Sequence, residues 1–214
     1  HRTVTEVFEV AQDAEIAIEL DPRVTRRPML EMLRKLGFNR ASLGVQDFDD
    51  RVQEHVGRVQ PFPLVREMVT LCRELGFDSI NFDLIYGLPY QTIDTVQATL
   101  DKTIELSPDR IAYYQYAQIP DKIASQRGLD YQQLPDSDIK LDMYLLGQEV
   151  FSAAGYVFIG LDHFAKPEER LARALREGTL QRNFQGMTTG GGLDLIGLGA
   201  SSIGQLIDVG FLQN

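Results

Sequence analysis

The sequence predicts an α/β protein built as a partial parallel β/α barrel. Apolar stripes at helical spacing alternate with short apolar runs over the first 166 residues, and parallel strands require crossover helices of this kind. Polar side chains gather where the expected strands end, which is how such barrels assemble an active site. An open doubly wound sheet stays possible, because the sequence period alone does not show closure.

Five strands and four crossover helices account for this first region. The expected strands cover residues 16–21, 41–45, 79–86, 110–116 and 157–161. The helices that precede the last four of them cover residues 29–36, 64–75, 93–106 and 139–154. Gly37, Gly76 and Gly155 stop three of these helices, since glycine readily takes the left-handed conformation just past a helix end.

Asp83 is the most informative polar residue, because it lies inside an apolar strand that a Gly87-Leu88-Pro89 turn ends. Burying a carboxylate there is costly unless it is paired or used, so Asp83 belongs either to a structural ion pair or to a ligand site. Glu19 lies on the strand face opposite Ile18. It is either a solvated carboxylate or a group that binds ribose hydroxyls or a cation.

Other polar residues near the strand ends have two interpretations each. Gln46 and Arg58 are either surface groups or ligand contacts, and an arginine fork would suit a carboxylate. His163, in Asp162-His163-Phe164, is either a hydrogen-bonded structural histidine or a substrate contact. We expect Glu19, Gln46, Asp83, Tyr116 and Asp162 to converge on one rim of the barrel.

Composition excludes several functional classes. The 214 residues carry a formal net charge of −10, which argues against a nucleic-acid partner. We find no apolar run of about 18 residues, so we expect no membrane span. The single cysteine, Cys72, lies on an apolar helical stripe and is expected in the core. It fits a reducing compartment such as the cytoplasm and leaves no metal site in these residues.

The alternating helix and strand patterns end after residue 166. We expect residues 1–166 to form the incomplete barrel. Residues 167–214 should form a barrel-mouth helix over 168–177 and a Gly-rich loop over 188–204 that leads into a truncated C-terminal domain. The glycine runs alone are weak signals of a ligand site.

Several phrases together resemble one family. The phrases Gly37–Phe48, Asp83–Pro89, Gly160–Pro167 and Arg182–Gly186 are similar to those of the radical S-adenosylmethionine (radical SAM) proteins of the coproporphyrinogen oxidase group. They resemble in particular its oxygen-independent coproporphyrinogen III oxidases, which act in haem synthesis. This resemblance covers essentially the whole chain.

The resemblance implies a cofactor set and a reaction. It places one S-adenosylmethionine at Glu19, Gln46, Arg58, Asp83, Ala117 and Ile203, and a second at Ile85 and Gln185. It implies a [4Fe–4S] cluster in the complete protein. It also implies a 5′-deoxyadenosyl radical reaction that decarboxylates two propionates of coproporphyrinogen III, giving protoporphyrinogen IX. The expected partners are the porphyrinogen and an unidentified electron donor and acceptor, and we expect a monomer.

The sequence departs from the family's pattern in three ways. The cluster-binding Cys-x3-Cys-x2-Cys loop would precede His1, Met187 stands where the family has an aromatic residue, and the C-terminal domain is cut after Asn214. We therefore expect the 214 residues alone to be inactive. One alternative is a haem chaperone of the same superfamily, although Gln181 stands where that group has a histidine. Another is a catalytically silent barrel fragment.

Overall fold

The structure is a computed structural model that describes residues 2–183 and 186–213. It divides into two compact units, the first ending at Glu169 and the second beginning at Arg170. The sequence-based boundary lies three residues earlier, between residues 166 and 167.

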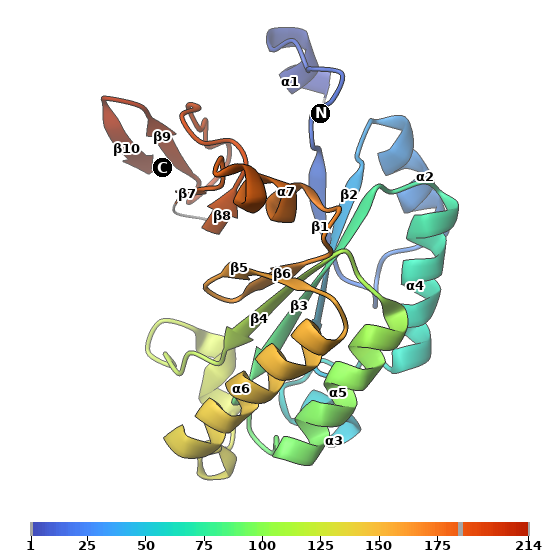
Figure 1. Cartoon of the computed structure of the whole chain (residues 1–214), viewed down its shortest axis with the longest axis vertical. Helices are drawn as coiled ribbons and strands as arrows, with labels where there is room; N and C mark the ends of the chain where they lie inside the picture. The colour runs from blue at the N-terminus through green and yellow to red at the C-terminus, as the bar shows by residue number, and fades with distance from the viewer. Residues whose placement is uncertain (1, 184–185, 214) are drawn as a thin grey trace. The chain divides into compact units, whose positions relative to one another are not determined.

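The first unit is a six-stranded sheet with the order β1-β2-β3-β4-β6-β5 (Figure 1). Its strands are β1 (Ala17–Leu20), β2 (Arg40–Gln46), β3 (Ser79–Tyr86), β4 (Arg110–Gln115), β5 (Val157–Gly160) and β6 (His163–Ala165). Its helices are α1 (Arg2–Val7), α2 (Arg27–Lys35), α3 (Asp50–His55), α4 (Phe62–Glu74), α5 (Ile93–Leu106) and α6 (Ser137–Ala153), with 3-10 turns at Ala124–Gly128 and Tyr131–Gln133.

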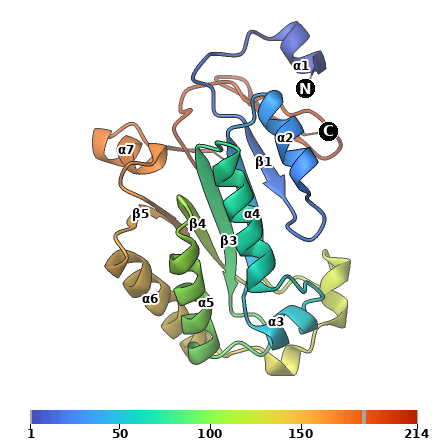
Figure 2. The ribbon, with the colours of Figure 1, turned by 90° about the vertical axis from the view of Figure 1, so that its right-hand side faces the viewer.

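One face of the sheet packs against α2, α4, α5 and α6 (Figures 1 and 2). Ile80, Phe82 and Leu84 of β3 are at most 1% exposed and join the same apolar core as the helices. The intervening residues of the strand, such as Asp83, point to the other face because side chains alternate along a strand. These helices therefore cover one face of the parallel strands, as in a barrel wall and unlike a doubly wound sheet. This confirms the predicted fold class.

The ends of the helices follow the expected turn chemistry. Gly37, Gly76 and Gly155 take positive φ values of 91°, 77° and 86° after α2, α4 and α6, a conformation that glycine adopts without a Cβ clash. Thr92 begins α5 with a capping box in which it exchanges hydrogen bonds with Thr95. These local signals fix where each helix gives way to the next strand.

One edge of the sheet departs from the parallel pattern that the sequence predicts. Strand β6 lies between β4 and β5 and is antiparallel to both. Gly160 and Leu161 take φ values of 117° and 55°, which reverses the chain within a few residues. Phe164 then packs on Phe151 and Phe158, with ring centroids 4.9 and 5.3 Å apart. His163 therefore begins a returning strand instead of closing β5.

The second unit is small and largely irregular. It contains α7 (Arg170–Glu177) and two antiparallel pairs, β7 (Gln181–Asn183) with β8 (Gly186–Thr188) and β9 (Ile203–Leu206) with β10 (Gly210–Gln213). Among the described residues of the whole chain, no helix combines the length and the apolar character that a membrane crossing requires.

Candidate functional site

Polar side chains lie in register on the sheet face that the helices leave uncovered. One row runs from Glu19 through Ser42 to Asn81 on β1, β2 and β3. A second row, two positions further along the strands, runs through Gly44, Asp83, Ala112 and His163 on β2, β3, β4 and β6. Paired residues present their side chains to the same face, so Glu19 and Asp83 lie on one face, two rows apart.

Asp83 is held by hydrogen bonds. Asn81 Nδ2 donates to its Oδ1 at 2.9 Å, and Ser42 Oγ donates to its Oδ2 at 3.1 Å. Burial raises the pKa of Asp83, although these bonds, the His163 charge and the Arg40 charge act in the opposite direction. Among the described residues, no cation forms an ion pair with this carboxylate within 4 Å. The carboxylate thus retains acceptor capacity for a ligand.

Gln46 and Arg58 meet above Gly44. The Cβ that Gly44 lacks would lie 2.8 Å from both Gln46 Nε2 and Arg58 Nη2, so any other residue at this position would displace the ends of both side chains. Gln46 takes φ 66° at an irregularity in the β2–β3 register, a conformation that is unusual for a non-glycine residue and concentrates at functional sites. Arg58 Nε is buried and has no hydrogen-bond partner in the described part of the chain.

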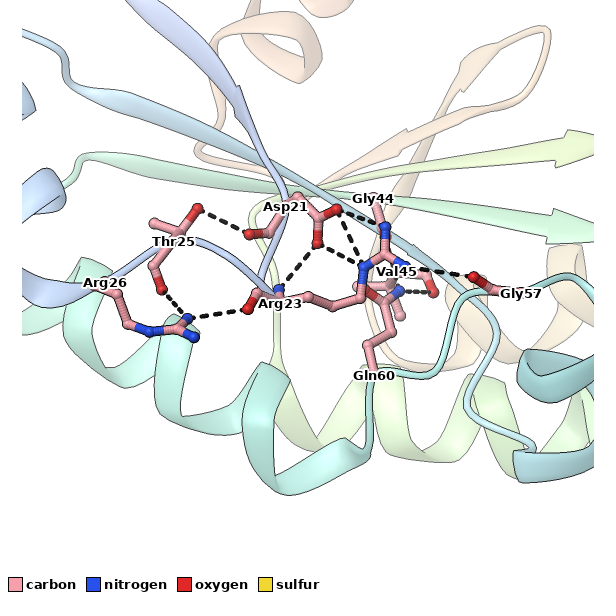
Figure 3. A network of polar contacts seen from close by, with 8 residues as sticks. All are labelled: Asp21, Arg23, Thr25, Arg26, Gly44, Val45, Gly57 and Gln60. Carbon is pink, nitrogen blue, oxygen red and sulfur yellow. Dashed lines mark hydrogen bonds and ion pairs between the residues drawn. The ribbon is translucent and has the colours of Figure 1, made fainter. Parts of the chain in front are cut away.

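A pair of charged residues, Asp21 and Arg23, contacts the loop at Gly57, the residue before Arg58 (Figure 3). Arg23 forms an ion pair with the carboxylate of Asp21, with a shortest N···O distance of 2.7 Å. Its Nη1 also donates to the carbonyl of Gly57 at 3.4 Å. Hydrogen bonds from Arg23 lower the pKa of Asp21 to about 2, and the Arg58 charge adds to this shift. Arg23 therefore ties the loop after β1 to the loop that carries Arg58.

Two buried glutamines hold the end of β2 and the loop of Arg58 together. Gln53 Nε2 donates to the carbonyls of Asp47 and Gln60, and its Oε1 accepts from the Gln60 backbone N–H at 2.9 Å. Gln60 Nε2 donates to the carbonyl of Gly44 at 2.8 Å and to that of Val45 (Figure 3). Arg58 lies between the two glutamines, and its own N–H donates to the Gln53 carbonyl. We call Gln53 and Gln60 the amide clasp.

We predict that Gln60→Leu destabilises the protein by about 1–3 kcal/mol, because two buried carbonyls at the end of β2 lose a donor. It should also weaken ligand binding at Gln46, whose backbone follows directly. Gln97→Leu is the matched control, since among the described residues Gln97 bonds only Asp101, on the exposed side of α5. It should change stability by less than about 0.5 kcal/mol. Urea unfolding of both variants tests this. Equal midpoints would contradict a role for the clasp.

Asp47, next to the clasp, is 1% exposed and accepts three hydrogen bonds. Its donors are the Asp49 N–H at 2.5 Å, Gln91 Nε2 at 2.6 Å and Thr99 Oγ1 at 3.1 Å. Burial raises its pKa to about 6 despite these bonds. This network lies on the helix side of the site, so we interpret Asp47 as structural.

The raised pKa of Asp47 makes stability depend on pH. Its ordinary value is 3.8 and its folded value about 6, so between these pH values the unfolded chain ionises while the folded carboxyl stays protonated. The free energy of unfolding should therefore fall by up to about 3 kcal/mol as pH rises from 4 to 6, and then level off. Urea unfolding at several pH values, with Asp47→Asn as control, tests this. The same pH dependence in the variant would contradict it.

The remaining sequence-predicted residues fall in different places. Ile85 lies on β3 beyond Asp83, and Ala117 is exposed just after β4, where its carbonyl accepts from Gln126 at 2.9 Å. Ile203 begins β9 in the second unit. Gln185 lies outside the described residues. Tyr116 follows β4, with its N–H bonded to the Tyr86 carbonyl, and the Asp162 carbonyl accepts from the Tyr113 N–H.

Several residues of this face escape prediction from the sequence. Ser42 and Asn81 bond Asp83, and Tyr114 lies two residues beyond Ala112 on β4. The signal for Ser42 and Asn81 is the alternation of polar and apolar residues along β2 and over residues 79–84 of β3, which predicts a second polar face. Tyr114 has no such signal, because β4 does not alternate. The amide clasp carries no comparable signal, because isolated glutamines in a sequence are usually exposed.

The opposite end of the sheet is closed by ion pairs. Arg110 is only 9% exposed at its side chain and contacts Glu15 at 2.6 Å and Glu169 at 2.5 Å, while Arg40 contacts Glu15 at 2.8 Å. These charges are mutually neutralised. The unpaired polar groups of the face therefore lie toward the carboxyl ends of the strands.

Comparison with known proteins identifies the family. Residues 2–103 match the radical SAM superfamily. Oxygen-independent coproporphyrinogen III oxidases from Pseudomonas aeruginosa and Thermostichus vulcanus are 49% and 47% identical over 92% and 97% of the chain. The chain covers 43% and 63% of those proteins, and it spans about half the length of most curated relatives it matches.

A solved structure gives the same result for the fold. Coproporphyrinogen III oxidase (HemN) from Escherichia coli, a radical SAM enzyme, is 46% identical and superposes with a TM-score of 0.92. The match covers 95% of this chain and 47% of that one. The chain therefore belongs to the radical SAM superfamily, and within it to the family of the oxygen-independent coproporphyrinogen III oxidases.

Proposed function

We propose that these residues form the cofactor-binding barrel of an enzyme that converts coproporphyrinogen III to protoporphyrinogen IX by oxidative decarboxylation. The main supporting observation is the open polar face near Gly44. There, among the described residues, the Asp83 carboxylate has no ion-pair partner and the Arg58 Nε has no hydrogen-bond partner. The whole protein would be a cytoplasmic monomer that works with an electron donor and an electron acceptor.

The residues of this face fit S-adenosylmethionine. Arg58 offers a buried donor without a partner, which suits the carboxylate of the methionyl group. Asp83 and Glu19 offer acceptors to ribose hydroxyls or to the ammonium group, and Gln46 can both donate and accept. The family resemblance adds Ala117 and Ile203 to the proposed contacts of this molecule, and it assigns Ile85 and Gln185 to a second S-adenosylmethionine. Bound S-adenosylmethionine would supply the radical that removes a hydrogen atom from each propionate.

The residues of this chain do not fit the [4Fe–4S] cluster that radical SAM enzymes use. Such a cluster is held by cysteine thiolates, and the sequence has one cysteine. Cys72 is fully buried in α4, and burial raises its pKa to about 12. No cluster of three potential metal ligands occurs among the described residues. We therefore assign these residues to binding and orienting S-adenosylmethionine alone.

Turnover by the complete protein tests the function. The protein, reconstituted anaerobically, is incubated with coproporphyrinogen III, S-adenosylmethionine and a reductant, and the products are separated by chromatography. We expect protoporphyrinogen IX and two molecules of carbon dioxide for each porphyrinogen. S-adenosylmethionine cleavage without any porphyrinogen product would contradict the proposed substrate while leaving the superfamily assignment intact.

A further inference from the structure

His163 is a titratable residue of the open face that the proposed contacts do not use. It pairs with Ala112, which pairs with Asp83, so the imidazole and the carboxylate share one row with a single methyl group between them. His163 Nδ1 is buried and has no hydrogen-bond partner among the described residues. A buried polar atom without a partner costs about 1–3 kcal/mol. His163 is therefore not a structural histidine with both ring nitrogens hydrogen-bonded.

Tyr114 contacts the other imidazole nitrogen of His163, Nε2. Its hydroxyl lies 3.5 Å from His163 Nε2, and the two rings meet edge to face at 87°. Burial, with the charges of Asp83, Asp162 and Glu19, raises the pKa of Tyr114 to about 12, so the phenol keeps its proton, and we assign it as the donor to Nε2. The proton of a neutral imidazole then lies on Nδ1, which becomes a donor.

Burial favours the neutral form of His163, and the carboxylates around it favour an uncharged ligand atom over an anionic one. Burial lowers the pKa of His163, opposed by Asp162 and Asp83 and assisted by Arg110. Glu19, Asp83 and Asp162 have no ion-pair partner within 4 Å in the described part of the chain. A ligand carboxylate beside Nδ1 would add a further negative charge to these three, and like charges repel.

We propose that the Nδ1–H of neutral His163 donates a hydrogen bond to an uncharged acceptor atom of a bound adenosyl group. Asp83 accepts from a hydroxyl of the same group, so the row recognises a nucleoside through one donor and one acceptor. Tyr114 acts as a positioning residue that fixes the tautomer. The identity of the ligand rests on the proposed function, and either of the two S-adenosylmethionine molecules could supply the adenosyl group.

Two substitutions of His163 separate the roles of its two nitrogens. The amide nitrogen of His163→Asn stands near the position of Nδ1, whereas that of His163→Gln stands near Nε2. We titrate the complete reconstituted protein calorimetrically with S-adenosylhomocysteine, which cannot be cleaved. His163→Asn should bind within about threefold of the wild type and His163→Gln about tenfold more weakly, the loss expected for one hydrogen bond. The binding step that weakens identifies which of the two sites contains His163.

Other outcomes would overturn the proposal. Wild-type affinity in both variants, the reverse order of affinities, or no binding by the wild type would each refute it. Titration in buffers of different ionisation enthalpy adds a test, because it measures proton uptake on binding. Uptake in the wild type but not in His163→Asn would mean that His163 becomes charged beside a charged acceptor, which would also refute the proposal.

If both variants melt early, Tyr114→Phe should still weaken binding about threefold at an unchanged melting temperature. Failure to convert coproporphyrinogen alongside the expected binding pattern would refute the proposed function alone.

Discussion

The 214-residue chain is expected to bind no stoichiometric [4Fe–4S] cluster after anaerobic reconstitution with iron and sulfide. Its one thiol is fully buried among the apolar side chains of α4 and keeps its proton at neutral pH, since burial raises the pKa of Cys72 to about 12. A protonated thiol does not ligate iron, and one thiolate would not replace three. Visible absorption and electron paramagnetic resonance of the reduced sample measure the outcome.

Cys72→Ala is the matched control for this experiment, because it removes the thiol from the same core position. It should give the same absorption and resonance spectra as the unchanged chain. A stoichiometric cluster in the unchanged chain that disappears in the variant would show that Cys72 is a ligand and that our interpretation of α4 is wrong.

In the complete protein, Asp83→Asn is expected to weaken S-adenosylmethionine binding by about ten- to a hundredfold. A charged hydrogen bond contributes about 1.5–3 kcal/mol, which converts to that range of affinity. The substitution should not lower the stability of the fold. The introduced amide can accept from Asn81 Nδ2 and donate to Ser42 Oγ, whose hydroxyl is free to rotate, and the substitution removes a charge whose burial raises the pKa of Asp83. We expect a melting temperature equal to or above that of the wild type.

Calorimetric titration and thermal melts of the same samples separate the two roles of Asp83. Ser42→Ala is a useful companion, because it removes one donor to Asp83 but leaves the carboxylate and its charge. It should weaken binding less than Asp83→Asn does. Normal binding combined with early melting in Asp83→Asn would mean that the carboxylate serves the fold and not the ligand.

The sequence predicts the helices and parallel strands well because their signals are local. Periodic apolar residues, Gly37 and Gly76 mark the units, and a carboxylate at Asp83 stands out within an apolar strand. The insertion of β6 between β4 and β5 depends on contacts between residues about 50 apart, such as Arg110 with Ala165. No short pattern records such contacts. The burial of Gln53 and Gln60 is likewise decided by where α3 and α4 pack.

Among the candidate site residues, the sequence distinguishes best those whose chemistry conflicts with their neighbours. Asp83 conflicts with Phe82 and Leu84, whereas the polarity of Tyr114 is masked by its value as an ordinary strand former. The interpretation of His163 stays open at the level of sequence, because which nitrogen lacks a partner depends on the antiparallel pairing of β6 with β4.

The position of β6 also sets an order of assembly during synthesis. Strands β1 to β4 can pair in the sequence in which they leave the ribosome, since each lies beside its predecessor. The far edge of β4 stays unpaired until residues 163–165 emerge, about 50 residues later. An exposed strand edge is a template for pairing with other chains. Nascent chains that stop within α6 would therefore expose the unpaired edge of β4 to other chains. The three residues of β6 cover this edge by pairing with it.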